Sequence, residues 1–431
     1  MSGPCETIRA RQFVVHRYRY RMRTDTRGWA RLVFTMLLSI LLGIGAGGVA
    51  TADSGRTQNF VDTAPGTVHS VQPLAAEAGL PGTARAHLLT YWTMGPTGTP
   101  ALSSGTVFVP NGQAPAGGWP IMSWAHGTVG VGDQCAPSRN PYQGRQLQYL
   151  SHWISEGYAV VATDYAGLGT PGPHAYLEKT SAARSVIDMV RAARSVESAL
   201  SDRWMAIGQS QGGHAVLQAA RIATSYAPEL DYRGVVATGA PSNLEYAFQI
   251  GGPWIPDLGL DGLNVFAAYV LAGLRESRPD LDVDSYLTDF GRSEVGNVEA
   301  NCPGDLRKHH GSVGALLSRP VAGTEMFEAL TEYLSVPVDG YDRPIFLGQG
   351  LLDTMVPSPL SVPLVAGLIA HGQDVTYVPY LYSGGEFVGH EGSMIASMID
   401  STPFVHRLLD PVQMRSLPLR SGDGAWTRSH R

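Results

Sequence analysis

The most informative stretch of this chain is Gly208-Gln209-Ser210-Gln211-Gly212. It lies between the apolar run Trp204–Ile207 and the helix-like run His214–Arg221. This pattern predicts a strand, a sharp turn flanked by glycines, and a helix, which is the context of a nucleophilic serine. The turn exposes the serine hydroxyl. The N-terminus of the helix favours the negative charge that develops beside it. A side chain at either glycine would clash with the adjoining strand and helix. The alternative is a serine that only caps a helix.

Short apolar segments bounded by turn residues recur along the chain and predict strands. They are Ala86–Thr93, Gly105–Pro110, Pro120–Trp124, Ala159–Asp164, Trp204–Ile207, Gly234–Thr238, Pro344–Leu347 and Val375–Tyr380. Several are apolar throughout, which indicates strands that are buried on both faces. Helical patterns alternate with them, as at Ala182–Leu200 and Ser210–Ala227. We therefore predict an α/β fold with a mostly parallel sheet, helices on both faces, and the first two strands as an antiparallel hairpin at its edge.

The alternation of strands and helices stops between Pro241 and Tyr341. Helical patterns at Leu263–Arg275 and Thr324–Leu334 fall inside this stretch, which is too long for a structureless loop in a compact domain. We predict an inserted helical cap over residues 242–340 and a core formed by residues 53–241 and 341–410. Residues 411–431 are polar and predict a flexible tail.

A nucleophilic serine needs a base, and the base needs an acid that orients it. On a doubly wound sheet these residues follow in the order serine, acid, histidine. His390 fits the role of base, because it lies in a glycine-rich loop after the last predicted strand and before a helix that starts at Ser393. His214 lies on the helix just after the serine and cannot reach over it, and His371 ends a helix.

Asp353 fits the role of the acid. It lies in the loop at the carboxyl end of a predicted strand, the edge of an open α/β sheet where catalytic groups gather. Asp342 precedes that strand and lies at its other end, while Glu386 and Glu391 flank the histidine and are weaker rivals. The alternative for Asp353 is a carboxylate that caps a turn.

The oxyanion of an acyl-transfer reaction needs backbone N–H donors held in place around it. One should come from Gln211, directly after the serine, and another from the loop after an early strand. The stretch Ala125-His126-Gly127-Thr128 follows such a strand, so Gly127 or Thr128 is the predicted second donor. The alternative is an ordinary glycine turn.

The N-terminus has the pattern of an export signal. Arginines are frequent up to Arg31, Leu32–Ala50 is apolar, and Ala50-Thr51-Ala52 is a cleavage pattern. We predict a signal peptide over residues 1–52, cleaved after Ala52, with Met1 and Met22 as the two alternative start positions. An uncleaved membrane anchor at the cell envelope is the alternative.

The remaining cysteines and the charge fit an exported globular protein. Cys135 and Cys302 can pair in an oxidising compartment, or both can remain buried free thiols. The net charge of -6 provides no basic field for nucleic acid. The sequence holds no metal-binding or nucleotide-binding motif, so we expect no cofactor.

With these pieces together, the chain resembles the α/β-hydrolase superfamily, and within it the secretory lipase family of the lipase A type. The matching stretches, in family order, are Ala125–Thr128, Cys135–Ser138, Thr163–Gly169, Gly208–Gly213, Gly350–Asp353 with Val356-Pro357, and His390. The resemblance implies an exported carboxylic-ester hydrolase whose helical insertion caps an acyl pocket. It also favours a disulfide between Cys135 and Cys302.

We therefore predict a secreted lipase or esterase that acts through Ser210, His390 and Asp353 and an acyl-enzyme. Apolar residues of the cap, such as Trp254, Ile255, Phe266 and Leu274, favour an acyl chain, although core packing within the cap is the commoner role for any single one of them. We expect a small-molecule or lipid ester as substrate and transient contact with a lipid interface. The alternatives are an acyltransferase or a peptidase with the same triad, or a cell-surface binding protein without turnover.

Overall fold

The structure is a computed structural model that describes residues 62–256, 263–302 and 312–409. The predicted signal peptide, its cleavage site after Ala52 and the predicted tail over residues 411–431 lie outside the described residues.

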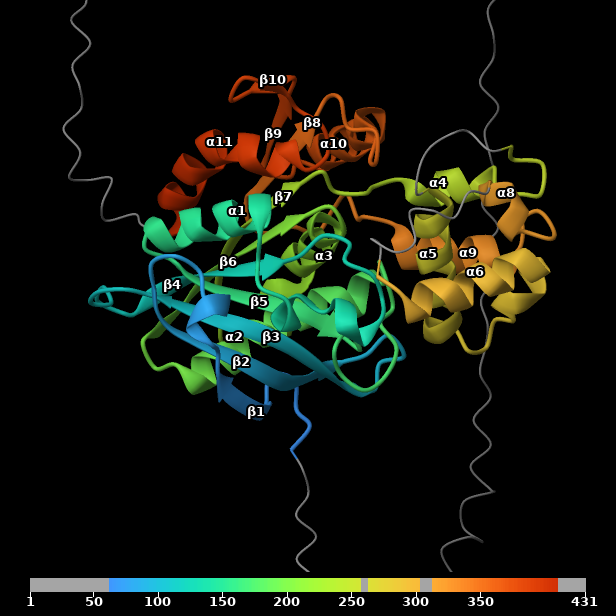
Figure 1. The fold of residues 1–431 in the computed structure, drawn as a ribbon. Helices are drawn as coiled ribbons and strands as arrows, with labels where there is room; N and C mark the ends of the chain where they lie inside the picture. Colours follow the sequence, from blue (N-terminus) through green and yellow to red (C-terminus); the bar gives the residue numbers. More distant parts are fainter. Residues whose placement is uncertain (1–61, 257–262, 303–311, 410–431) are drawn as a thin grey trace, which may run out of the picture. The chain divides into compact units, whose positions relative to one another are not determined.

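A nine-stranded mixed sheet forms the centre of the fold, with strand order β1-β2-β3-β5-β4-β6-β7-β8-β9 (Figure 1). The strands are β1 (Val68–Pro73), β2 (Thr83–Met94), β3 (Pro100–Pro110), β4 (Trp119–Ala125), β5 (Ala159–Ala166), β6 (Leu200–Gln209), β7 (Asp231–Thr238), β8 (Ile345–Gly350) and β9 (Val375–Tyr380). The pairs from β5 across to β9 are parallel, whereas those among β1, β2, β3 and β5 are antiparallel. The predicted α/β fold is confirmed.

One detail at the edge of the sheet differs from the prediction. The hairpin of β2 and β3 forms, but β1 pairs with the outer side of β2 and takes the edge position itself. Most residues of β1 are polar or exposed, so it lacks the apolar run that marks a buried strand. A further small hairpin, β10 (Tyr382–Ser383) and β11 (Glu386–Phe387), occupies part of the loop before His390.

Helices cover both faces of the sheet, because its central strands are apolar on both sides. All positions of β5 and β8 are buried. Helices α2 and α3 pack on one face, and α1 and α11 pack on the other (Figure 1). The core helices are α1 (Gly144–Ser155), α2 (Lys179–Val196), α3 (Gln211–Tyr226), α10 (Ser361–Ala370) and α11 (Gly392–Leu409). The short 3₁₀ turns are η1 (Ala76–Ala78), η2 (Asp133–Cys135), η3 (Pro137–Arg139), η4 (Val283–Tyr286) and η5 (Ser358–Leu360).

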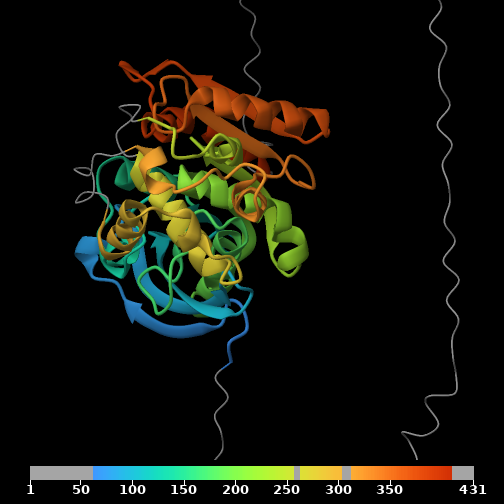
Figure 2. The ribbon, with the colours of Figure 1, turned by 90° about the vertical axis from the view of Figure 1, so that its right-hand side faces the viewer.

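A helical insertion separates β7 from β8, and Figure 2 looks onto it. Its helices are α4 (Leu244–Gln249), α5 (Leu263–Ser277), α6 (Asp289–Ala300), α8 (Val313–Leu316) and α9 (Glu325–Leu334). They bury a hydrophobic cluster of their own, in which α5 supplies the longest run of buried residues. The domain limits at residues 242 and 340 stay a prediction. None of the helices in the described residues combines the length and the hydrophobicity that a membrane crossing needs.

Candidate active site

Ser210 occupies the sharp turn between β6 and α3, and its backbone is strained there, with φ of +57°. The flanking glycines are required by close packing. A Cβ on Gly208 would collide with the backbone of Gly212, and one on Gly212 would collide with the carbonyl group of Ala125 at the end of β4. The turn therefore leaves no room for side chains beside the serine, which lines two cavities of the molecule.

The structure brings the three predicted catalytic residues within hydrogen-bonding distance of one another. His390 Nε2 lies 2.8 Å from Ser210 Oγ, and His390 Nδ1 lies 2.7 Å from Asp353 Oδ2. An ionised Asp353 can only accept, so Nδ1 carries the proton and Nε2 is free to accept the serine proton. His390 and Asp353 are both buried, at 8% and 5% exposure, so water does not compete for these hydrogen bonds.

Asp353 is held in the loop after β8 by donors on both of its oxygens. Its Oδ1 accepts from the backbone N–H groups of Met355 and Val356 at 2.9 and 2.8 Å, and its Oδ2 accepts from Gln349 Nε2 at 3.1 Å. These donors fix the carboxylate in the orientation that faces the imidazole. The rival carboxylates point elsewhere, because Glu386 and Glu391 are exposed and lie near Arg145, at 4.0 and 3.0 Å.

The predicted oxyanion donors lie beside the serine. Gln211 is the first residue of α3, so its N–H has no partner within the helix. Gly127 faces the turn, since a Cβ built on it would lie 3.5 Å from Ser210 Cβ. Thr128 lines the same cavity as Ser210, and its Oγ1 lies 2.6 Å from Tyr176 Oη. Their roles as donors stay predictions.

Buried polar residues support this loop, and the sequence analysis missed one of them. Tyr165, in the left-handed region with φ of +72°, donates from Oη to the carbonyl oxygen of His126 at 2.8 Å. His174 stacks on Tyr165, and its Nε2 lies 3.0 Å from Gln211 Nε2. Burial lowers the pKa of His174 to about 4, so the ring is neutral and accepts from the amide. No sequence signal marked His174, because its partners are distant along the chain.

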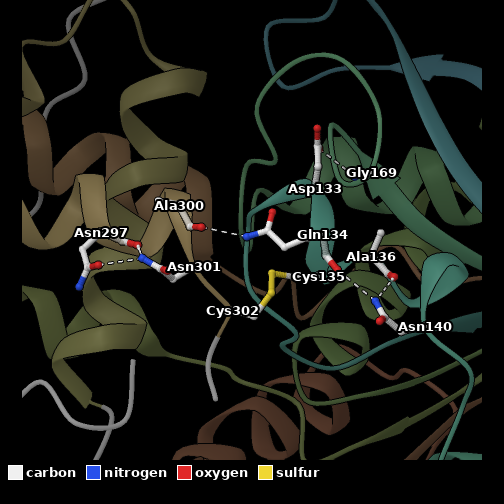
Figure 3. Close-up of a disulfide and its surroundings, with 10 residues drawn as sticks. All are labelled: Asp133, Gln134, Cys135, Ala136, Asn140, Gly169, Asn297, Ala300, Asn301 and Cys302. Carbon is white, nitrogen blue, oxygen red and sulfur yellow. Dashed lines mark hydrogen bonds between the residues drawn. A yellow bond between two sulfur atoms is a disulfide. The ribbon is translucent and has the colours of Figure 1, made fainter. Parts of the chain in front are cut away.

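A disulfide joins the loop after β4 to the helical insertion (Figure 3). Cys135 ends η2 and Cys302 follows α6, and their Cα atoms are 5.7 Å apart. Beside the bond, Gln134 Nε2 donates to the carbonyl oxygen of Ala300 at 2.9 Å. The oxyanion loop and the insertion are therefore fastened to each other by one covalent bond and one hydrogen bond.

Two cavities meet at Ser210 and His390. The first has a volume of about 470 Å³ and an almost entirely apolar lining, which includes Leu244, Phe248, Trp254, Ile255, Phe266 and Val270. Three of the four cap residues predicted to contact an acyl chain therefore line it, whereas Leu274 is fully buried in the core of the insertion. The second cavity has a volume of about 740 Å³ and a mixed lining. Within the described part of the chain, no group of three or more acidic, histidine or cysteine side chains could hold a metal ion.

The model of the family described as secretory lipase matches residues 142–315. Lipase A of Moesziomyces aphidis is 23% identical over 383 residues, an alignment that covers 82% of this chain and 78% of the relative. The chain is similar to the secretory lipases over this segment. The chain also matches a probable inactive lipase of Mycobacterium tuberculosis, at 26% identity over 82% of this chain and 78% of that relative.

The fold of the chain matches that of solved structures. Candida antarctica lipase A in its closed state superimposes with a TM-score of 0.66 and 20% identity, over 81% of this chain and 83% of that chain. A likeness at this identity shows the α/β-hydrolase fold.

Proposed function

We propose that this protein is a serine carboxylic-ester hydrolase, a lipase or esterase that acts through Ser210, His390 and Asp353. The observation that carries the proposal is the pair of hydrogen bonds made by His390, one to the serine hydroxyl and one to the aspartate. The site has the parts that nucleophilic acyl transfer requires: a strained, half-buried serine, a buried histidine and a carboxylate fixed by several donors.

In this mechanism Ser210 Oγ attacks the ester carbonyl while His390 Nε2 takes the serine proton. Asp353 holds the imidazole in its tautomer and stabilises the imidazolium that forms. The N–H groups of Gln211 and of Gly127 or Thr128 bind the tetrahedral oxyanion. The alcohol leaves with the proton from His390, and water then hydrolyses the acyl-enzyme and releases the acid.

The first cavity supports an apolar acyl half for the substrate. Its lining offers aliphatic and aromatic side chains from α4, α5, the segment that joins them and the loop after β8, and it reaches the nucleophile. Burial of an alkyl chain there contributes about 0.8 kcal/mol for each methylene group. We propose that the protein is secreted, with a signal peptide cleaved after Ala52, in keeping with its similarity to secretory lipases.

Two other functions remain as alternatives. The same triad could transfer the acyl group to an alcohol or cleave an amide, because one fold serves many reactions. A binding protein without turnover is the second alternative, and one relative is named a probable inactive lipase. The hydrogen bonds that join Ser210, His390 and Asp353 favour an enzyme over a binding protein without turnover.

The test is hydrolysis of p-nitrophenyl esters from acetate to palmitate by the wild type, Ser210→Ala and Ser225→Ala. Ser225 is a matched control, because it is an exposed serine on the same helix α3. We expect Ser210→Ala to remove nearly all turnover without loss of the fold, and Ser225→Ala to behave as the wild type. Wild-type activity in Ser210→Ala would overturn the proposal, and the absence of covalent labelling by an organophosphonate would favour the binding protein.

A further inference from the structure

Tyr165 is a buried, strained residue that the mechanism above does not use. It lies near the end of β5, is 1% exposed and has a φ of +72°. A tyrosine in the left-handed region persists only where the surrounding structure holds it there, and such residues cluster at functional sites. Its ring contacts two other buried rings, those of His126 and His174, with centroids 4.6 and 5.6 Å away.

The hydroxyl of Tyr165 orients the loop after β4. Its Oη donates to the carbonyl oxygen of His126 at 2.8 Å. In a planar trans peptide the C=O and N–H groups point in opposite directions, so this bond also sets the direction of the Gly127 N–H. His126 Nδ1 then donates to the carbonyl oxygen of Gly127 at 2.6 Å, which sets the direction of the Thr128 N–H in the same way. Both predicted oxyanion donors of this loop are therefore on oriented peptides.

His174 extends the same arrangement to the other predicted donor. Its ring stacks on that of Tyr165 with an angle of 12° between the planes. Its Nδ1 lies 3.3 Å from the carbonyl oxygen of Ala166, so Nδ1 carries the proton of the neutral ring and Nε2 accepts. Gln211 Nε2 donates to His174 Nε2 at 3.0 Å, and Gln211 is 1% exposed. The residue that follows the nucleophile is thereby held by its own side chain.

We propose that Tyr165 and His174 are positioning residues that hold the backbone donors on both sides of the oxyanion hole in place around Ser210. The proposal rests on the proposed ester hydrolysis. Neither residue lines the two cavities that contain Ser210, so each acts on the substrate only through the residues that it holds. Fixed donors stabilise the charge of the transition state more than the uncharged ester. Loss of either residue should therefore lower kcat and leave KM near its wild-type value.

The first experiment deletes the hydroxyl of Tyr165. We expect Tyr165→Phe to lower kcat by about 10-fold to 100-fold on a p-nitrophenyl ester, with KM little changed. Tyr341→Phe is the matched control, because Tyr341 Oη also donates to a backbone carbonyl oxygen, that of Pro337 at 2.9 Å. Tyr341 precedes β8, at the end of that strand away from Asp353, and its variant should keep the wild-type kcat. A wild-type kcat in Tyr165→Phe, or a rise in KM without a fall in kcat, would overturn the proposal.

The second experiment measures the oxyanion hole directly, with a trifluoromethyl ketone that carries the same acyl chain. Ser210 Oγ adds to its carbonyl carbon, the serine proton passes to His390, and the negatively charged oxygen mimics the oxyanion of the reaction. We expect the inhibition constant of Tyr165→Phe to rise by the factor by which its kcat/KM falls. A role in stability alone would leave the inhibition constant of the folded variant unchanged, and that result would contradict the proposal.

The third experiment tests the second arm, and it also decides the matter if Tyr165→Phe fails to fold. His174→Leu removes the acceptor for Gln211, whereas His174→Gln keeps an acceptor oxygen in its side chain. We expect kcat to fall about tenfold or more in His174→Leu and to recover in large part in His174→Gln. Wild-type kcat in His174→Leu, or equal losses in both variants, would overturn the positioning role while ester hydrolysis by the wild type stands. No hydrolysis of any ester by the wild type would overturn the proposed function as well.

Discussion

His214 Nε2 lies 2.9 Å from the carbonyl oxygen of Leu334, and this hydrogen bond joins the first turn of α3 to the end of α9. The helix that carries the nucleophile is thereby tied to the helical insertion. The His214 ring is buried, and burial lowers its pKa to about 4. The folded protein therefore holds this imidazole in its neutral form, while the unfolded chain protonates it near its ordinary pKa.

This pKa shift predicts a loss of stability in acid. A lowered folded-state pKa contributes stability that is present above pH 6.5 and is lost as the pH falls toward 4. The loss amounts to about 3 kcal/mol for this one group. We expect His214→Gln to reduce the difference between the free energies of unfolding at pH 7 and pH 4, measured with urea. His371→Gln is the control, at the exposed end of α10, and should show the same difference in unfolding free energy between pH 7 and pH 4 as the wild type. If His214→Gln also showed the full wild-type difference, His214 would not be the source of the acid sensitivity.

The hydrogen bond between Asp353 and His390 predicts a large effect of a single atom change. Asp353→Asn keeps the shape of the side chain but can donate to Nδ1 and so favours the wrong imidazole tautomer. We expect kcat to fall by about 10⁴-fold with the thermal unfolding midpoint little changed. Glu386→Gln is the control for charge loss near the site, because Glu386 is exposed and lies outside the triad. A kcat near that of the wild type in Asp353→Asn would mean that another carboxylate orients His390.

The packing of Gly212 against Ala125 predicts that the turn tolerates no added methyl group. Gly212→Ala would push the nucleophile turn away from the carbonyl group that ends β4, next to the oxyanion loop. A displacement of about 1 Å costs about 100-fold in rate, so we expect kcat to fall by at least that factor. Gly296→Ala on α6 is the matched control, because nothing lies within 4 Å of its added Cβ. Equal activity of the two variants would show that the turn can relax.

The disulfide between Cys135 and Cys302 predicts a redox-dependent stability. It closes a loop with a sequence separation of 167 residues, and such a bond typically contributes about 2–5 kcal/mol. We expect dithiothreitol to lower the urea midpoint of the wild type. The double variant Cys135→Ser and Cys302→Ser should start at the lower midpoint and should not respond to dithiothreitol. A wild-type midpoint that is insensitive to complete reduction would contradict a stabilising role.

Local sequence patterns specify most of the strands and helices and the chain order of the candidate catalytic residues. The apolar runs of β4 to β9 and the glycines around Ser210 specify buried strands and a strained turn through local chemistry, since side-chain size and hydrophobic patterning act within a few residues. The placement of Asp353 and His390 after the later strands followed from sheet topology, and the structure brings both beside Ser210. The sequence pattern did not predict the edge strand β1, because this strand is stabilised by pairing with β2 and not by its own composition.

Which distant side chains meet depends on the packing of the whole molecule. The contact of His174 with Gln211 and the bond of His214 to Leu334 depend on elements that pack across the whole chain. The division into an apolar cavity and one with a mixed lining likewise depends on how α4 and α5 lie over the sheet edge. Local sequence patterns do not predict such contacts. Burial and hydrogen-bond partners are set when residues that are remote in the sequence pack against each other in the folded molecule.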